Sequence, residues 1–401
     1  MSDSTRNEEN SRPARLLSFG LLITVVIHML VHAAGNMRST LFPVLKEEFM
    51  LTNQQIGLIA AIPTFCTVLF AIPAGVFSDR FGARKLMALS IVMAAVGAFL
   101  GSISANPWMY IVASTLLTLN GTIYHPPAQS YTTKITKPRD RARALGIWNA
   151  GGTFGVSLGP LSISVLMGYL AFQWRQVYQF WVLPILFGLV ALFFVKDPDD
   201  VAHKEDSEER IEEDEATSLL SSNMIMFLVS SGIRRFGGSL TPIFLTIWLV
   251  ENQNWTLANL GVMFAASSMM GIVASPLGGE LASRVGEKRW TVLTLFASYT
   301  CFVIAITLKG FWPFMFFYLA QRFFGILGMP ASSAITARLS PRRQRGMGFA
   351  LSTLPGSLVG SVGPIAAAFI ADSYGIYPIF IVAAAIYYIG LGVFHFGVKM
   401  D

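Results

Sequence analysis

The chain has 401 residues and a net charge of +6, and its composition is 53% hydrophobic but only 13% charged. A mean hydropathy of +0.56 is too apolar for an ordinary soluble protein of this length, so the composition indicates a membrane protein and gives no hint of nucleic-acid binding. Only Cys66 and Cys301 are present, both inside apolar runs, which argues against a disulfide framework or a cysteine zinc site.

Twelve apolar stretches have roughly the length that a helix needs to cross a bilayer, about 20 residues. We expect them near residues 16–42, 54–77, 86–104, 108–132, 143–168, 174–195, 222–250, 256–282, 290–308, 311–337, 346–371 and 376–397. The first stretch is too long for a signal-peptide core, so we expect it to remain in the mature protein after a polar tail, 1–15. The chain is therefore predicted to be an all-α membrane protein with twelve transmembrane helices.

An acidic segment separates the helices into two sets of six. Residues 196–217 contain eleven acidic and three basic residues, a composition that cannot bury enough apolar surface to fold alone. We expect an N-terminal six-helix bundle at 16–195, a cytoplasmic linker at 196–221 and a C-terminal six-helix bundle at 222–401.

The positions of lysine and arginine predict the orientation in the membrane. If the N-terminus is cytoplasmic, only Lys46, Arg175 and Lys309 fall in loops on the outer side. Because cytoplasmic loops carry an excess of basic residues, we expect both termini to be cytoplasmic, in a cytoplasmic (inner) membrane.

The two halves of the sequence resemble each other in one register. Residues 75–85 read GVFSDRFGARK, and 279–289, which begin 204 positions later, read GELASRVGEKR. The same offset pairs 119–126 with 323–330 and 157–160 with 361–364. Such repeats predict two pseudo-symmetric bundles related by an axis along the membrane normal, with a substrate cavity between them near the midplane.

The repeated loop resembles the loop signature of the major facilitator superfamily, a family of secondary transporters with two six-helix halves. The resemblance implies the major facilitator fold, alternating access and a conformational latch at this loop. The expected latch residues are Gly75, Asp79, Arg80, Gly82, Arg84 and Arg284. Asp79 would attract the positive end of a neighbouring helix, although Ser283 replaces it in the second copy and Asp79 could simply be an exposed loop charge.

Glycines in the fifth helix resemble part of the antiporter motif of the same superfamily. The residues shared with that motif are Gly146, Gly155, Gly159 and Pro160. The closing Gly-Gly pair of the motif is missing, because Ile163 and Ser164 stand there. Gly151, Gly155 and Gly159 would form a smooth stripe that permits close helix contact, so packing alone and a role in antiport both remain open.

Arginines lie near the middle of the predicted membrane helices, where the sequence places no carboxylate. Arg234 and Arg235 lie about 18 Å into the seventh helix and Arg322 about 16 Å into the tenth, at about 1.5 Å per residue. Arg38 lies further out on the first helix. An anionic substrate would satisfy such guanidinium groups, since they match carboxylate or phosphate geometry. Bonds to backbone carbonyls, or snorkelling of Arg38 to headgroups, are the alternatives.

Three histidines are candidates for proton coupling. His28, His32 and Asn36 recur every four residues, so they share one face of the first helix, and Asn36 is a candidate substrate contact. His125 precedes two prolines that are expected to kink or open the fourth helix. Histidine titrates near neutral pH and could carry the coupling proton, or the histidines could be neutral core residues. No third metal ligand is identifiable, so no metal and no cofactor are expected.

A second resemblance concerns residues 121–126 and 146–160, which are similar to the fosmidomycin-resistance branch of the superfamily, where an aromatic-His-Pro sequence occupies helix four. The Glu-Gly expected after His-Pro is replaced here by Pro127-Ala128. The resemblance implies a phosphonate-like or other organic anion as substrate. Trp148 and Asn149, beside the glycine stripe, are further candidate substrate contacts.

The sequence thus predicts a secondary transporter, proton-coupled and carrying a small organic anion such as a carboxylate, phosphate ester or phosphonate. The alternatives are a multidrug or cationic-solute efflux antiporter, and a lipid flippase or non-transporting sensor of the same fold. No nucleophile, base and orienting acid cluster together, so an enzyme is not expected. The expected partners are the substrate, a proton and the lipid bilayer, with a monomeric chain and no nucleic acid.

Overall fold

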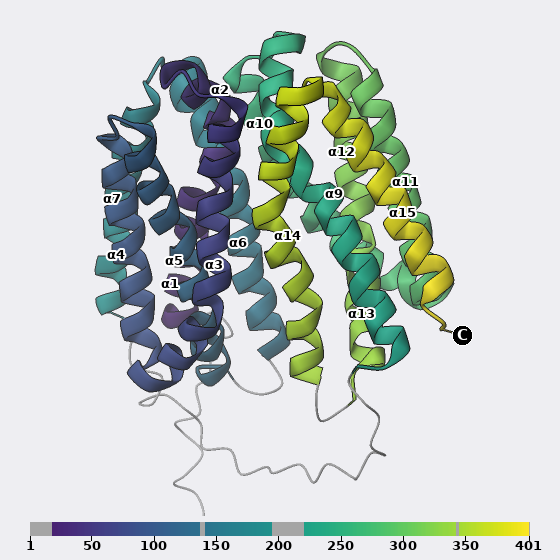
Figure 1. Cartoon of the computed structure of the whole chain (residues 1–401). Coiled ribbons are helices and arrows are strands. Elements are labelled where there is room, and N and C mark those ends of the chain that lie inside the picture. The colour runs from purple at the N-terminus through teal and green to yellow at the C-terminus, as the bar shows by residue number, and fades with distance from the viewer. Residues whose placement is uncertain (1–17, 137–140, 195–219, 342–344, 401) are drawn as a thin grey trace, which may run out of the picture.

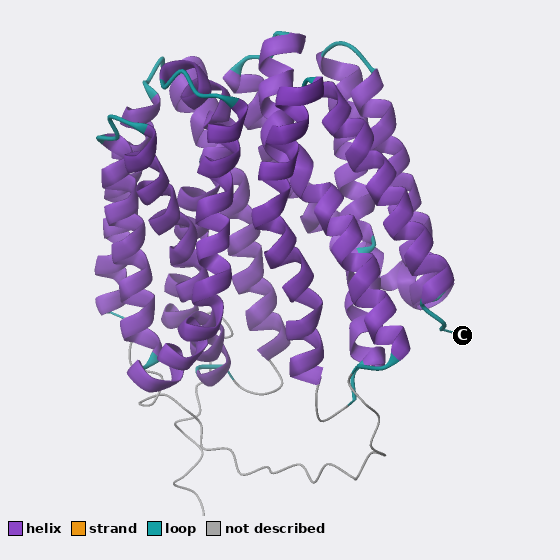
Figure 2. Cartoon of the chain, viewed as in Figure 1, coloured by secondary structure: helices purple, strands orange, loops and turns teal. Residues whose placement is uncertain are grey.

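A computed structural model describes residues 18–136, 141–194, 220–341 and 345–400, and all regular elements in these ranges are helices (Figures 1 and 2). They are α1 (Phe19–Asn36), α2 (Arg38–Glu48), α3 (Asn53–Phe81), α4 (Ala83–Ser102), α5 (Pro107–Lys134), α6 (Arg141–Ile163), the π-helical turn η2 (Ser164–Tyr169), α7 (Trp174–Phe193), α9 (Ser222–Gln253), α10 (Leu257–Val285), α11 (Glu287–Thr307), α12 (Phe311–Leu327), α13 (Met329–Leu339), α14 (Arg345–Tyr374) and α15 (Tyr377–Gly397).

These helices form twelve spans when α1 is joined to α2, α6 to η2, and α12 to α13. Nine of the described spans are long and apolar enough to cross a membrane by length and hydropathy alone. The other three, α5, α9 and α14, have similar lengths of 28, 32 and 30 residues. The prediction of twelve membrane helices in an all-α chain is confirmed.

The internal repeat is visible in the helix boundaries. α3 and α10 begin and end 204 residues apart, at Asn53–Phe81 and Leu257–Val285. Between α3 and α4, Gly82 has φ +85°, and between α10 and α11, Gly286 has φ +95°. Only glycine adopts such backbone angles without strain, which explains why this residue recurs in both copies of the loop.

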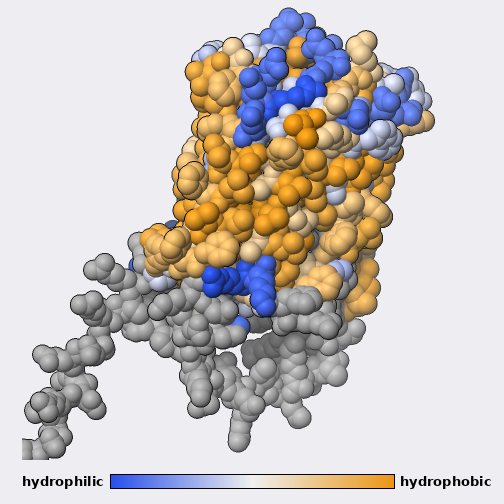
Figure 3. All heavy atoms as spheres, turned by 90° about the vertical axis from the view of Figure 1, so that its left-hand side faces the viewer, coloured by the Kyte–Doolittle hydropathy of each residue, from blue (hydrophilic) through white to orange (hydrophobic). Residues whose placement is uncertain are grey.

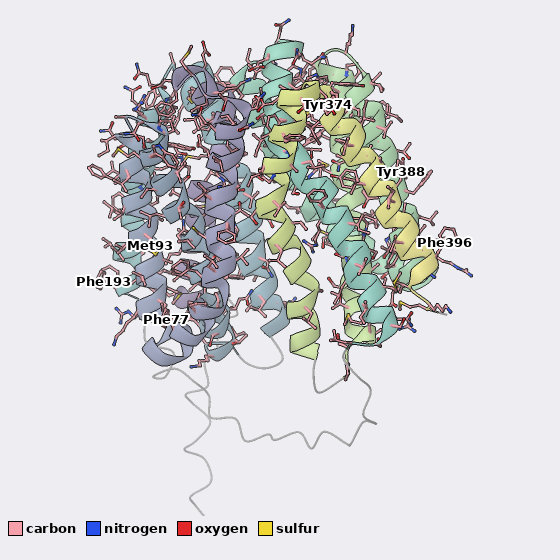
Figure 4. All side chains as sticks on the ribbon, in the orientation of Figure 1. Phe77, Met93, Phe193, Tyr374, Tyr388 and Phe396 are labelled. Atoms are coloured by element: carbon pink, nitrogen blue, oxygen red, sulfur yellow. The ribbon has the colours of Figure 1, made fainter. Side chains whose placement is uncertain are left out.

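The described helices divide into two groups, α1 to α7 and α9 to α15, which lie side by side in Figure 1. Within the first group α1 packs against α6, and within the second α9 packs against α15. Phe193 and Phe396, which are 69% and 81% exposed, point outwards (Figure 4). Figure 3 shows a broad hydrophobic band on the outside with hydrophilic residues above it. This surface suits contact with lipid, and the chain is an integral membrane protein.

The glycine stripe of α6 lies flat against the backbone of α1. A β-carbon added at Gly155 would lie 2.2 Å from the Met29 carbonyl oxygen, and one at Gly159 would lie 2.5 Å from the Ala33 carbonyl oxygen. A β-carbon at Gly151 would lie 2.6 Å from Val25 Cγ1. The stripe therefore permits a helix approach that no larger residue would allow, which supports its interpretation as a packing feature.

The two groups of helices contact each other through α3 with α14, α6 with α10 and α2 with α9. We call the part of the molecule where α2 ends, at the top of Figure 1, the α2 end. There Lys46 forms a 2.8 Å ion pair with Glu251, and Asn53 Nδ2 donates to Asp372 Oδ1 at 2.9 Å.

Small residues allow the helix backbones to touch at the same end. A β-carbon added at Gly57 would lie 2.9 Å from the Pro364 carbonyl oxygen, and one at Gly261 would lie 2.5 Å from the Pro160 carbonyl oxygen. Ser164 Oγ also donates to the Ala258 carbonyl at 2.9 Å. The α2 end of the interface between the two groups is therefore closed.

Candidate functional site

A cavity of about 570 Å³ lies between the two groups of helices. Its lining comes from α1, α2, α3 and α5 on one side and from α9 and α14 on the other. Four of the predicted site residues line it, namely His32, Asn36, Arg38 and His125. None of the described residues that line this cavity is an acid.

Arg38 supplies the fixed positive charge of the cavity. Its Nη1 atom is buried and has no hydrogen-bond partner among the described residues. The guanidinium lies within electrostatic range of Tyr110 and Tyr178, whose hydroxyl groups hydrogen-bond to each other at 3.0 Å. A buried cation without a carboxylate partner is costly, so this atom is available to a ligand that accepts hydrogen bonds.

The other membrane arginines occupy different surroundings and do not line this cavity. Arg234 Nε donates to the Ser230 carbonyl at 3.2 Å, and its guanidinium carbon lies 5.5 Å from the Phe394 ring centre. Arg235 is exposed, and its Nε donates to Ser231 Oγ at 3.3 Å.

Arg322 is exposed on α12, within electrostatic range of the tyrosines at 318 and 387. We expected arginines from three helices to meet in one cavity. Arg38 lines this cavity, but Arg234, Arg235 and Arg322 do not.

His28, His32 and His125 form a compact cluster, the histidine triad. Nε2 of His125 lies 3.2 Å from Nε2 of His28 and 3.1 Å from Nε2 of His32. The candidate ligand atoms of all three lie within 4.8 Å of one another. We expected no third candidate ligand beside His28 and His32. That expectation is wrong, because α5 brings His125 against α1.

Backbone carbonyls fix the tautomers of two triad members. Nδ1 of His28 lies 2.8 Å from the Trp148 carbonyl oxygen, and Nδ1 of His125 contacts the Gly121 carbonyl oxygen. A carbonyl oxygen only accepts hydrogen bonds, so both Nδ1 atoms must carry hydrogen. In the neutral rings, the Nε2 atoms of His28 and His125 therefore carry a lone pair and no hydrogen, and these two atoms face each other.

Trp148 positions the triad instead of lining the cavity. Its ring is buried and stacks on His28, with centres 3.7 Å apart and planes 17° apart. Asn149 is exposed on α6 and does not line this cavity. Asn36 lines the cavity and donates from Nδ2 to the His32 carbonyl at 2.8 Å.

The prolines after His125 do not open the helix. We expected the prolines to kink or open the fourth helix. α5 stays helical from Pro107 to Lys134, with Pro126 and Pro127 inside it, so the expected opening is wrong and a kink stays a prediction.

The latch residues are described only in part. The surroundings of Gly75 and the side chains of Asp79 and Arg80 lie outside the described residues. Arg84 donates to the Phe193 carbonyl at 2.8 Å, and Arg284 forms a 2.6 Å ion pair with Glu280 one turn away on α10. These two contacts lie within one group of helices each, and a latch between the groups stays a prediction.

Hydroxyl groups are the part of the site that sequence reasoning missed. The cavity is also lined by Ser39, Thr64, Thr67, Thr118, Thr122 and Ser239. Several donate to their own helix, as Thr118 does to the Ser114 carbonyl at 2.6 Å, which leaves oxygen lone pairs for a ligand. Serine and threonine occur throughout membrane helices, so only the spacing of Thr118 and Thr122 on one face could have suggested this role.

Comparison with known proteins agrees with this architecture. The sequence profile of the family described as Major Facilitator Superfamily matches residues 24–234 and 226–399. The fold is similar to two crystal structures of a bacterial homolog of the human lysosomal transporter Spinster. The inward-facing, occupied form has a TM-score of 0.78 at 16% identity over 93% of this chain and 95% of that one. The unoccupied form has a TM-score of 0.79 at 14% identity, over 97% and 98%.

Curated relatives include bacterial resistance proteins. Multidrug resistance protein MdtG of Proteus mirabilis is 26% identical over 376 residues, 87% of this chain and 88% of that protein. Tetracycline resistance protein class B of Escherichia coli is 23% identical over 356 residues, 86% of each. Multidrug resistance protein MdtH of Sodalis glossinidius is 27% identical over 139 residues, which span only 32% of this chain and 34% of that protein. With a family profile that covers almost the whole chain and a matching fold, this protein belongs to the Major Facilitator Superfamily and is a membrane transporter, not an enzyme.

Proposed function

We propose that this transporter carries a small organic anion, such as a carboxylate, phosphate ester or phosphonate, by alternating access. The observation that carries the proposal is Arg38, a cation in the cavity between the bundles with a buried, unpartnered Nη1 among the described residues. Guanidinium binds such anions through paired hydrogen bonds, and the hydroxyl-rich lining adds further polar contacts.

The closed α2 end supports a transport cycle in which the bundles rock about the cavity. With the orientation that the basic residues predict, both termini are cytoplasmic and the α2 end faces outwards. The bundles at 16–195 and 222–401 would then be closed to the outside, joined by a cytoplasmic linker at 196–221 that is mostly outside the described residues. In this state cargo would exchange with the cytoplasm of a cell whose inner membrane holds the protein.

The histidine triad supports coupling to protons. Lone pairs on His28 and His125 face each other at 3.2 Å, an arrangement that a shared proton would stabilise. The ring centre of Tyr124 lies 5.7 Å from that of His28, and Arg38 lines the same cavity as His32 and His125. Because His32 and His125 line the cavity, a proton and an anionic cargo could bind together and offset each other's charge.

Efflux of drugs is the second candidate function, since the relatives include proteins named for resistance to multiple drugs and to tetracycline. A cationic drug would call for a membrane-embedded carboxylate, and no described lining residue of the cavity is one. The cavity therefore favours an anion over a cationic drug, whichever direction transport takes.

Counterflow in proteoliposomes tests the proposal. Vesicles loaded with an unlabelled organic phosphate, phosphonate or carboxylate should take up the same labelled anion, while cationic drugs should not exchange. Exchange of cationic drugs alone would overturn the anion proposal and favour drug efflux, the second candidate function. Movement of labelled lipid without solute exchange would indicate a flippase, and binding without any flux would indicate a sensor.

The second prediction concerns pH. Transport by the wild type should change over the range from acidic to neutral pH, because the triad gains a proton as the pH falls, and His32→Gln or His125→Gln should flatten that profile. His395→Gln is the matched control, because His395 is exposed on α15 and outside the triad. Transport measured across this pH range with equal pH on both sides of the vesicle gives the profile. A wild-type profile retained in both triad variants would contradict proton coupling at the triad.

A further inference from the structure

The histidine triad contains two lone pairs that face each other, and a ligand other than a proton could bind between them. Two acceptor nitrogens, on His28 and His125, lie 3.2 Å apart, and neither carries a hydrogen in the neutral ring. A metal cation binds such lone pairs directly. We infer that His28, His32 and His125 form a binding site for a divalent transition-metal ion of the Zn²⁺ class, which goes beyond the proposed transport of an anion.

The spacing of the nitrogens suits such an ion. Zn²⁺ binds histidine at about 2.0–2.1 Å in tetrahedral geometry, which places two ligand nitrogens about 3.3 Å apart. The measured Nε2 separations from His125 are 3.2 Å to His28 and 3.1 Å to His32. All three ligand atoms lie within 4.8 Å, so a small rotation of His32 would complete the set.

Two members of the triad are oriented as metal-binding histidines usually are. Such a histidine donates its second ring N–H to a carbonyl or carboxylate, which fixes the ring and its tautomer. Nδ1 of His28 has the Trp148 carbonyl as this partner at 2.8 Å, and Nδ1 of His125 has the Gly121 carbonyl. Stacking on Trp148 at 3.7 Å holds the His28 ring further.

The cavity provides an entry path and an open coordination position. His32 and His125 line it, whereas His28 lies behind them and is only 2% exposed. Three protein ligands leave a fourth position for water or an anion, as in catalytic zinc sites. Imidazole ligands select Zn²⁺, Cu²⁺, Ni²⁺ or Co²⁺ over Mg²⁺ and Ca²⁺, which prefer oxygen.

The charge of Arg38 and the location of the three histidines in one bundle determine how a bound ion would affect transport. The positive Arg38 lines the same cavity, so a dication would bind more tightly when an anion occupies its fourth position. The ligands come from α1 and α5, and the carbonyl of Trp148 from α6, all in one bundle. The ion would therefore not fasten the two bundles together, but it would compete with a proton for the same nitrogens.

Cobalt spectroscopy of the wild type tests the site directly. The full-length protein, purified with a histidine-free tag and stripped with EDTA, is titrated with Co²⁺ and then with Zn²⁺. We expect one Co²⁺ per chain with the intense visible absorption of a four-coordinate ion, displaced by Zn²⁺ but not by Mg²⁺. The absence of saturable binding, or the weak spectrum of a six-coordinate ion, would overturn the inference without touching the transport proposal.

Variants locate the ion at the triad. His28→Gln, His32→Gln and His125→Gln should each weaken binding by at least about 10- to 100-fold, the loss seen when only an orienting partner is removed. His395→Gln should bind like the wild type. Equal binding in all four variants would place the ion elsewhere and overturn the assignment.

Gly152→Ala offers a test that keeps all three imidazoles. A β-carbon there would lie 2.4 Å from His28 Cε1, so the ring must move away from its position. Metal affinity should fall while the protein still unfolds cooperatively in the metal-free state. If the metal affinity of Gly152→Ala were unchanged, the position of His28 would not affect metal binding. That result would contradict a metal site that includes His28.

Discussion

Arg38→Gln should abolish or strongly reduce transport of an anionic cargo while leaving the protein folded in the membrane. Glutamine keeps a hydrogen-bond donor but removes the charge that faces the cavity. A hydrogen bond to a charged group contributes about 1.5–3 kcal/mol, which corresponds to roughly 10- to 150-fold in affinity. Counterflow of the labelled anion in proteoliposomes measures the loss.

Stability separates this role of Arg38 from a structural one. Because its Nη1 has no partner among the described residues, removing the buried charge should leave the melting temperature of the ligand-free protein unchanged or raise it. Arg38→Lys should retain part of the transport, since the charge remains but the two-pronged geometry is lost. Arg289→Gln is the control, an exposed arginine on α11. Wild-type transport in Arg38→Gln would defeat the assignment of Arg38.

Gly155→Ala should destabilise the N-terminal bundle severely. The added β-carbon would lie 2.2 Å from the Met29 carbonyl oxygen and 2.8 Å from Met29 Cα, both backbone atoms that cannot move without shifting α1. Overpacking of this kind costs about 1–3 kcal/mol and sometimes more. Thermal unfolding of the purified protein, followed by tryptophan fluorescence, should show a clearly lower melting temperature.

Gly146→Ala is the matched control on the same helix. No atom lies within 4 Å of a β-carbon added at Gly146, and alanine in a helix interior is favoured over glycine by up to about 1 kcal/mol. Its melting temperature should equal or exceed that of the wild type. If both variants melted alike, the close contact of α6 with α1 would not be a determinant of stability.

The fold could be predicted because its determinants are local or repetitive. Apolar length identified the spans, and the recurrence of glycine at 82 and 286 marked equivalent turns in the two halves. The repeat even set helix ends, since α3 and α10 are displaced by the same 204 residues at both boundaries. Breaks within a span, such as α1 to α2 at Met37, leave no such signal and were not predicted.

The site was predicted less well, because depth along a helix can be counted but the direction of a side chain cannot. Arg234 and Arg38 both carry a guanidinium inside the membrane, yet Arg234 packs beside Phe394 within its own bundle whereas Arg38 reaches the shared cavity. All three histidines were named as candidates for proton coupling, but their clustering was not predicted, for a related reason. His28 and His32 share one helix face, but His125 is 97 and 93 residues away from them, and only the packing of α5 on α1 brings it close.

Ligand binding to the purified protein tests most directly the claim that Arg38 prepares the cavity for an anion. The melting temperatures of the wild type and Arg38→Gln are compared with organic phosphates, phosphonates, carboxylates and cationic drugs, since a ligand that binds the native state raises apparent stability. We predict that one or more anions stabilise the wild type in a concentration-dependent way and that Arg38→Gln loses this response. Stabilisation by cations alone, or equal stabilisation of both proteins by the anion, would contradict the account.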